Sequence, residues 1–499
     1  AVAAAGYAKN LRHDIFYKVQ DFSFKNIDHF STSGLVTRMT TDITNVQMAY
    51  MMSIRLLARA PIMILLSWIM TLLINVKIAL LFLIVIPLLG GTLMFIAKKA
   101  HPHFIRVFDE YDELNNSVQE NVNASRVVKA FVREDYEINK FHGVSNYVYT
   151  LFTKAEKIVA WNSPVLQFMM YAVVLLIALI GGRSIVFGTM ETGELTSVIV
   201  YAIQILMSLN MVTFVFVMIM IAGASTDRIT EVLNEVPEMQ DKADTVKEVR
   251  NGEITFEHVD FSYAGEGGNL SLKDINIHIK SGQTVGIIGG TGSAKSTLVQ
   301  MIPRLYDVTG GAVKVAGVDV RDYNLEVLRD QVSMVLQKNV LFSGTIYDNI
   351  RWGNEKASDE EVKRVCRLAQ ADGFVNEFPN GYETMIVQGG NNVSGGQKQR
   401  LCIARALLKK PKILILDDST SAVDTKTDAL IRKAFREEIP DTTKIIIAQR
   451  VSSIEDADQI IVLDDGKIAG VGTSEELLQT NEIYREVYES QVKGGEEDE

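Results

Sequence analysis

Apolar residues form long runs in the first half of the chain and short runs in the second half. Four runs carry very few charges and reach the length of about 20 residues that a helix needs to cross a bilayer. They lie at residues 56–75, 78–97, 164–187 and 196–222. One such run also fits a buried helix of a large soluble protein, but four in succession favour a helical transmembrane domain over residues 1–236.

The pattern changes at residue 237. Residues 237–250 are charged and poor in aromatic side chains, as linkers are. Beyond Gly252, short β-branched runs alternate with helical patterns, and the expected strands lie at 254–256, 284–288, 313–315, 332–336, 413–416 and 444–447. This alternation predicts an α/β domain over residues 237–491. We expect the acidic tail at 492–499 to be solvated and disordered.

The distribution of basic residues predicts which side of the membrane each loop faces. The short loops at 75–77 and 188–195 contain a single basic residue, Lys77, whereas the segment from 98 to 157 is rich in lysine and arginine. The positive-inside rule makes the second side cytoplasmic, and the α/β domain follows on that side. We therefore expect a multi-pass protein of the cell (plasma) membrane. The net charge of -11 argues against a nucleic-acid partner, and Cys366 and Cys402 are spaced for neither a zinc site nor a disulfide framework.

A glycine-rich run joins an expected strand to an expected helix. It consists of Gly289, Gly290, Thr291, Gly292, Ser293, Ala294, Lys295, Ser296 and Thr297. Backbone N–H groups in such a loop hold phosphate oxygens, so the run predicts an ATP site in which Lys295 reaches the outer phosphates and Ser296 binds Mg²⁺. The alternative is an ordinary glycine-rich turn with a chance Lys-Ser-Thr, which the strand and helix context disfavours. Ala294 stands where the strict pattern has its second glycine.

From Gly252 to Gln491 the chain resembles the nucleotide-binding domain of ATP-binding cassette (ABC) exporters. The resemblance implies a P-loop fold with a helical signature subdomain. It assigns adenine stacking to Tyr263, approach to Mg²⁺ and the attacking water to Gln337, water-mediated Mg²⁺ binding to Asp417, and contact with the γ-phosphate on an opposite subunit to Ser394, Gly395, Gly396 and Gln397.

The first half resembles the membrane domain of the same exporters more weakly. Residues 32–42 are similar to their first intracellular loop, and residues 126–135 are similar to the second, where a coupling helix docks on a nucleotide domain. Because these exporters have six spans per half and only four are visible, we expect Ala1 to fall near the end of the family's second helix, with the first helix missing.

Four residues depart from the family pattern. Asp418 stands in place of the glutamate that polarises the attacking water, Gln449 in place of a histidine, and Gln388 in place of a glutamate before the signature; Ala294 is the fourth. Catalysis would fall to Asp418, Gln449 and Gln337. A retracted carboxylate is a poor general base, so the pattern predicts a site that binds ATP and hydrolyses it slowly.

Slow hydrolysis at one site favours a heterodimer in which a second half-transporter supplies the competent site. A homodimeric exporter with a slow aspartate base and an ATP-gated channel or regulatory subunit remain as alternatives, whereas fusion of the two domains argues against an importer. The spans carry few polar residues, among them Arg55, Arg59 and Asn210, and many methionines. This composition favours a hydrophobic substrate of drug or lipid type, although the polar residues also fit headgroup anchors and helix contacts.

Overall fold

A computed structural model describes residues 2–265, 267–418 and 423–496 of the chain. The chain divides into two compact units. The N-terminal unit comprises Ala1–Phe22 and Ile27–Val236, and the C-terminal unit comprises Ser23–Asn26 and Pro237–Glu499.

The described part of the N-terminal unit is helical. Its elements are α1 (Val2–Gln20), most of α2 (Phe24–Phe30), α3 (Thr32–Thr37), the π-helical turn η1 (Arg38–Asp42), α4 (Ile43–Met52), the π-helical turn η2 (Ser53–Leu57), α5 (Ala58–Ile74), α6 (Val76–Asn123), α7 (Ser125–Ala130), α8 (Glu134–Val159), α9 (Asn162–Val186) and α10 (Thr192–Asn234). The first three residues of α2 belong to the C-terminal unit.

Four helical stretches of this unit are long and apolar enough to span a membrane: Thr32–Ile74, Val76–Phe104, Glu134–Val186 and Thr192–Asn234. Each stretch overlaps one of the four apolar runs and extends beyond it. The connections are tight because polar side chains cap the next helix. The Asn75 carboxamide oxygen accepts hydrogen bonds from the backbone N–H groups of Lys77 and Ile78 at the start of α6, and Glu191 and Glu194 form a capping box at the start of α10.

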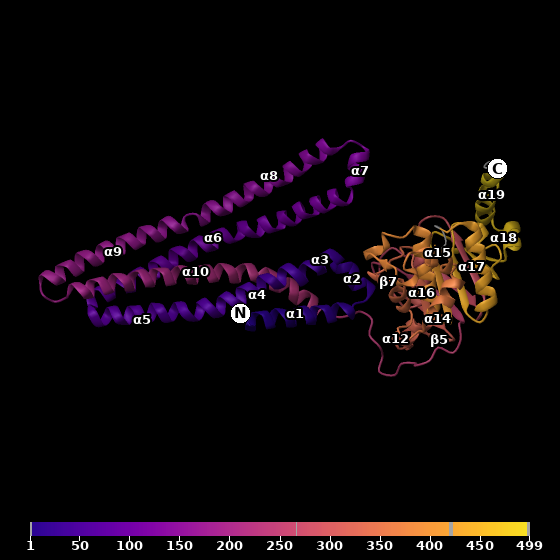
Figure 1. Cartoon of the computed structure of the whole chain (residues 1–499), viewed down its shortest axis with the longest axis horizontal. Helices are drawn as coiled ribbons and strands as arrows, with labels where there is room; N and C mark the ends of the chain where they lie inside the picture. Colours follow the sequence, from indigo (N-terminus) through magenta and orange to yellow (C-terminus); the bar gives the residue numbers. More distant parts are fainter. Residues whose placement is uncertain (1, 266, 419–422, 497–499) are drawn as a thin grey trace. The chain divides into compact units, whose positions relative to one another are not determined.

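Helix α10 packs against α4, α5, α6 and α9, and Figure 1 shows α5, α6, α9 and α10 running lengthwise together. Their shared core contains Phe82, Leu89 and Ile205, which are almost fully buried. Large apolar side chains such as Leu73 and Phe168 are exposed on the outer faces. Such exposure is unfavourable in water and is expected against lipid.

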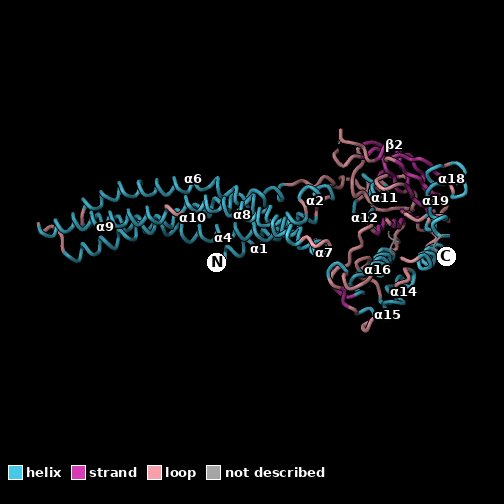
Figure 2. Tube along the Cα trace, turned by 90° about the horizontal axis from the view of Figure 1, so that it is seen from above, coloured by secondary structure: helices cyan, strands magenta, loops and turns pink. Residues whose placement is uncertain are grey.

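Figure 2 shows the strands, in magenta, within the C-terminal unit. The main sheet has the order β12-β11-β3-β10-β9-β6, and the second sheet has the order β2-β1-β4-β5. The strands are β1 (Ile254–Phe261), β2 (Leu272–Ile279), β3 (Thr284–Gly289), β4 (Gly310–Val315), β5 (Val318–Asp319), β6 (Val332–Val335), β7 (Gly344–Thr345), β8 (Met385–Ile386), β9 (Ile413–Asp417), β10 (Thr443–Ile447), β11 (Gln459–Asp464) and β12 (Lys467–Gly472).

Pairing is parallel from β11 through β6, and only β12 runs antiparallel in that sheet. Every residue of β9 and β10 is buried, which explains their unbroken apolar sequences, because a parallel strand is covered on both faces. The helices are α11 (Lys295–Gln300), α12 (Leu325–Gln331), α13 (Ile346–Arg351), α14 (Asp359–Leu368), α15 (Asp372–Glu377), α16 (Gly395–Leu408), α17 (Thr425–Glu438), α18 (Ser474–Thr480) and α19 (Glu482–Glu496).

The C-terminal tail differs from the expectation of disorder at 492–499. Helix α19 continues through Glu496, and residues 497–499 lie outside the described part of the chain. Adding a residue to an existing helix is far less costly than nucleating one, so a helix started by the upstream residues extends into a polar segment.

Candidate functional site

The phosphate loop, residues 289–297, connects β3 to α11. Its first residue, Gly289, has φ 157°, and a Cβ there would lie 2.1 Å from the carbonyl oxygen of Leu463, so a side chain has no room. Ala294 has φ 69° and immediately precedes α11. This left-handed conformation suits glycine, and for alanine it costs about 1–2 kcal/mol. The backbone at position 294 thus has the left-handed conformation that suits the glycine of the strict pattern, although the residue there is alanine.

The loop borders a cavity of about 720 Å³. The structure brings together at this cavity the residues that the sequence placed in one nucleotide site: the loop itself, Tyr263, Gln337, Asp417, Asp418 and Gln449. Asp465, from the turn after β11, and Val487 of α19 also line it. The sequence did not indicate these two, since neither belongs to a motif and only the fold brings them to the loop.

Lys295 lies inside the phosphate loop. Its Nζ donates hydrogen bonds to the carbonyl oxygens of Gly289 and Gly290, both at 2.8 Å, and to Ser293 Oγ at 3.3 Å. Burial lowers the pKa of Lys295, while the nearby charges of Asp417 and Asp418 oppose that effect. The ammonium group is therefore held at the loop by neutral acceptors that a phosphate oxygen can replace.

Ser296 and Asp417 meet across the loop and the end of β9. Ser296 Oγ donates to Asp417 Oδ1 at 2.9 Å, and Asp417 is almost fully buried. Burial raises the pKa of Asp417, and the Ser296 hydrogen bond opposes that shift. Hydroxyl, carboxylate and the nearby Gln337 amide are hard oxygen donors, few in number. This donor set fits Mg²⁺, which keeps several waters and takes few protein ligands.

Asp418 and Gln449 form a direct contact that the sequence did not reveal. Asp418 follows β9 and Gln449 follows β10, its parallel neighbour, in which Ile447 is paired with Asp417. Gln449 Nε2 donates to Asp418 Oδ2 at 2.7 Å. Burial raises the pKa of Asp418, and hydrogen bonds from Gln449 and Gln337 lower it in part. The carboxylate is thus held by two amide side chains.

Tyr263 stands at the rim of the cavity and is about half exposed. Its hydroxyl lies 3.0 Å from Thr297 Oγ1 in the phosphate loop. Its ring meets those of Phe261 and Tyr306 edge-on, with centroid distances of 4.8 and 5.3 Å. These contacts hold the ring beside the loop, where a flat base stacking on it would place its phosphates toward Lys295.

The signature segment, Ser394–Gln397, begins α16 and is not among the described residues that line this cavity. Ser394 Oγ accepts from the Gln397 backbone N–H at 3.3 Å, and Gln397 Oε1 accepts from the Ser394 N–H at 2.9 Å. This capping box fixes the helix start. Gln388 lies in a separate 3-10 turn, Gln388–Gly390, which does not line the cavity either.

Two polar positions of the spans have neighbours in the N-terminal unit. Arg59 lines a groove of about 320 Å³ between α5 and α10, together with Met63, Met207 and Met211. Asn210 Oδ1 accepts a long hydrogen bond from Asn162 Nδ2 at 3.5 Å. Asn210 thus contacts a neighbouring helix, one of the two roles that the sequence left open.

Comparisons with known proteins agree with this arrangement. Residues 1–209 match the family described as ABC transporter transmembrane region, and residues 272–421 match the family described as ABC transporter. The chain is 38% identical to the uncharacterized ABC transporter ATP-binding protein YfiB of Bacillus subtilis, over 98% of this chain and 85% of the relative. It is 33% identical to the ATP-dependent lipid A-core flippase of Desulfotalea psychrophila, over 97% of this chain and 84% of the relative.

A solved structure with a similar fold is that of a bacterial Atm1-family ABC exporter with ATP bound. The match has a TM-score of 0.89 at 24% identity and covers 98% of this chain and 86% of that one. The arrangement of a helical transmembrane domain followed by a nucleotide-binding domain is therefore shared with an exporter.

Proposed function

The chain belongs to the ABC transporters, as a half-transporter with the exporter fold, and we propose that it is the slowly hydrolysing subunit of a heterodimeric exporter. In this proposal the cavity beside the phosphate loop holds MgATP, with Lys295 on the outer phosphates and with Ser296 and Asp417 toward the metal. The ion supplies charge neutralisation at the phosphates. The transmembrane half lies in the plasma membrane, with the nucleotide domain in the cytoplasm.

The observation that carries the proposal is the hydrogen bond between Gln449 Nε2 and Asp418 Oδ2, 2.7 Å long. A general base must reach a proton of the attacking water within hydrogen-bond distance. Asp418 is one methylene shorter than glutamate, and Gln449 holds one of its oxygens away from any water. Gln449 also contributes no positive charge to a developing phosphate charge. The groups that bind ATP are present, whereas the two residues expected to assist hydrolysis, Asp418 and Gln449, are hydrogen-bonded to each other.

Substitution of Asp418 by glutamate tests this site. With saturating MgATP, Asp418→Glu should raise steady-state ATP turnover of the full chain in lipid nanodiscs at least about tenfold, since a positioned base contributes about 10²–10⁴-fold. Asp441→Glu, which makes the same chemical change at an exposed loop position, should leave turnover unchanged. Equal turnover in Asp418→Glu and the unaltered chain would contradict the proposal, as would fast hydrolysis by the unaltered chain alone.

A substitution in the signature segment tests whether this chain pairs with a different half-transporter. Ser394 and Gly395 are exposed in this chain, so they are free to meet ATP on another subunit. In the complex, Ser394→Arg should abolish most ATP turnover by blocking the partner's site, yet leave ATP bound to this chain's own phosphate loop. Unchanged turnover would mean that no competent site uses this chain's signature, which would contradict the heterodimer. Equal turnover by the complex and by this chain purified without a second half-transporter would favour a homodimer with a slow aspartate base.

Support for a hydrophobic substrate comes from the groove lined by Met63, Met207 and Met211 beside Arg59. Methionine side chains adapt to varied apolar surfaces, and the cationic Arg59 fits an amphiphile with an acidic headgroup. The relative named as a lipid A-core flippase is consistent with such a substrate. ATP-dependent movement of a fluorescent anionic lipid across vesicle leaflets tests this assignment, and ion flux without such movement would favour a channel.

A further inference from the structure

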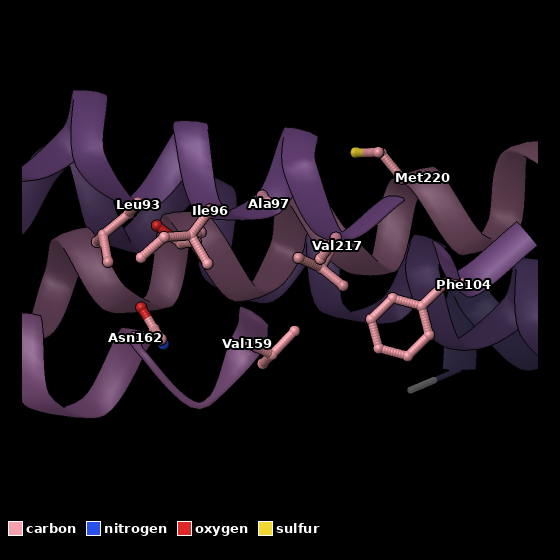
Figure 3. A pocket seen from close by; sticks show the side chains of 10 residues that line it. Leu93, Ile96, Ala97, Phe104, Val159, Asn162, Val217 and Met220 are labelled. Carbon is pink, nitrogen blue, oxygen red and sulfur yellow. The ribbon is translucent and has the colours of Figure 1, made fainter. Parts of the chain in front are cut away.

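A second cavity lies within the N-terminal unit, where α6, α10 and the junction of α8 with α9 meet. Its volume is about 130 Å³. The walls are almost entirely apolar, with Leu93, Ile96, Phe104, Val217 and Met220 among the side chains drawn in Figure 3. The space exists because α6 presents the small, buried residues Ala97 and Ala100 at this level.

One polar atom in the wall has no partner. Asn162 is the first residue of α9, and its Oδ1 is buried without a hydrogen bond in the described structure. Its Nδ2 makes only the long contact of 3.5 Å with Asn210 Oδ1. Figure 3 shows the amide oxygen of Asn162 directed toward Leu93 and Ile96, across the cavity. A buried amide oxygen without a hydrogen bond is unfavourable, because it has lost its bonds to water and gained none in return.

Water is a poor occupant of this cavity. A buried water requires about two to four polar partners. Besides Asn162, the polar side chain in the lining is Thr213, whose hydroxyl donates to the carbonyl oxygen of Leu209 at 3.1 Å and can still accept. The side chains of the lining therefore offer a water two partners at most, the lower limit of that range. An apolar molecule with one polar group matches the wall better than water does.

Size and chemistry then define the occupant. A cavity of about 150 Å³ lined by apolar side chains is known to hold benzene, so a volume of about 130 Å³ accommodates a single six-membered ring. The Asn162 amide presents an oxygen, or an NH₂ group after a half-turn of its terminal torsion, and a hydroxyl group pairs with either one. We propose that this cavity is a binding site for a phenol-type molecule, one apolar ring carrying one hydroxyl that hydrogen-bonds to Asn162.

This site is separate from the nucleotide cavity and from the groove at Arg59, so it does not depend on slow ATP hydrolysis or on the proposed lipid substrate. It lies where the helical stretch of α8 and α9 is interrupted at Ala160 and Trp161. A ring seated there contacts three helical stretches of the transmembrane half at once.

The test uses the full chain in phosphatidylcholine nanodiscs, because that lipid carries no hydroxyl donor to compete for Asn162. Binding of 4-fluorophenol and of fluorobenzene is measured by ¹⁹F NMR against empty nanodiscs, which account for partition into lipid. We expect 4-fluorophenol to bind about tenfold more tightly than fluorobenzene, a difference of about 1.4 kcal/mol.

Three variants decide the outcome. Asn162→Leu should remove the preference for the phenol while still binding fluorobenzene, which also shows that the cavity persists. Ala97→Leu should weaken binding of both probes about tenfold by filling the space. Asn146→Leu, the same change at an exposed position of α8, should alter neither. The proposal is overturned if the preference for the phenol survives Asn162→Leu, or if the unaltered chain binds the probes no better than empty nanodiscs do. If Asn162→Leu does not fold, the proposal is overturned when Ala97→Leu binds both probes as tightly as the unaltered chain does.

Discussion

The charge pair between Asp42 and Arg228 joins the π-helical turn η1 to the end of α10, and its removal should weaken the N-terminal unit far more than the loss of an exposed ion pair does. Asp42 is 0% exposed. Its Oδ2 accepts from Arg228 Nε at 2.9 Å, its Oδ1 accepts from Arg228 Nη2, and Ser225 Oγ donates to Oδ1 at 2.9 Å. Arg228→Met keeps an unbranched apolar stem but leaves the buried carboxylate with the serine hydroxyl.

The magnitude follows from these contacts. Two charge-assisted hydrogen bonds at about 1.5–3 kcal/mol each give about 3–6 kcal/mol, and breaking a buried ion pair costs about 3–5 kcal/mol. The Arg228 side chain is 45% exposed, so solvent already screens it and the lower end, about 3 kcal/mol, applies. For a unit of this size, about 2–4 °C per kcal/mol converts the loss into a fall of about 6–12 °C in the unfolding midpoint.

Tryptophan fluorescence provides the assay. The chain has three tryptophans, and in a Trp352→Phe background the remaining two, Trp68 and Trp161, report the N-terminal unit alone. Lys140→Met breaks the exposed pair with Glu120 and should shift the midpoint by less than about 2 °C. Adding Asp42→Asn to Arg228→Met removes the buried charge and should recover part of the loss. A shift below about 2 °C in Arg228→Met, or no recovery in the double variant, would refute the reasoning.

Three further predictions concern the nucleotide cavity. Ala294→Gly should relieve about 1–2 kcal/mol of left-handed backbone strain but lose about 0.4–1 kcal/mol because the unfolded chain becomes more flexible. The free energy of unfolding of the domain, measured by calorimetry, should therefore change by less than about 1.5 kcal/mol. MgATP should bind at least as tightly as to the unaltered chain. Burial raises the pKa values of Asp417 and Asp418 above the ordinary 3.8, so without ligand the folded domain gains stability relative to the unfolded chain as pH falls. Mg²⁺-dependent ATP binding, measured by calorimetric titration, should instead weaken as pH falls, because the carboxylates take up protons. Asp417→Asn should bind MgATP weakly at every pH. Tyr263→Ala should weaken ATP binding by about 1–3 kcal/mol if the ring stacks on the base, whereas Tyr263→Phe, which loses only the contact with Thr297, should bind nearly as the unaltered chain does in the same titration.

Local patterns in the sequence were sufficient for the four spans and for six strands, but they did not predict β2, β5, β7, β8, β11 and β12. The spans follow from apolar length alone, and β9 and β10 follow from unbroken apolar runs, because a strand covered on both faces leaves no polar positions. The phosphate loop was recognisable because it needs particular residues in consecutive positions. Each of these features is decided within about 25 residues of chain.

Features that depend on distant segments were not recognisable. The Asp42–Arg228 pair joins residues 186 positions apart, and neither residue belongs to an apolar pattern that indicates a partner. The cavity at Asn162 requires α6, α9 and α10 to pack with small residues at one level. The pairing of Asp418 with Gln449 requires β9 and β10 to be neighbours, which follows from the strand order and not from either strand's own sequence.

Because Asp418 and Gln449 are hydrogen-bonded to each other, we expect the effects of substitutions at these two positions on ATP turnover to depend on each other. In Gln449→His alone, the imidazole faces the Asp418 carboxylate and pairs with it instead of with phosphate, so ATP turnover should change little. Asp418→Glu alone should raise turnover about tenfold, although the longer carboxylate still accepts from Gln449. The double variant places the family's glutamate and histidine at both positions together, and contacting residues couple by about 0.5–3 kcal/mol, so its turnover should exceed the product of the single effects at least about twofold. Multiplicative effects in this cycle would instead mean that the two positions act separately, and slow hydrolysis would then rest on the short Asp418 carboxylate alone.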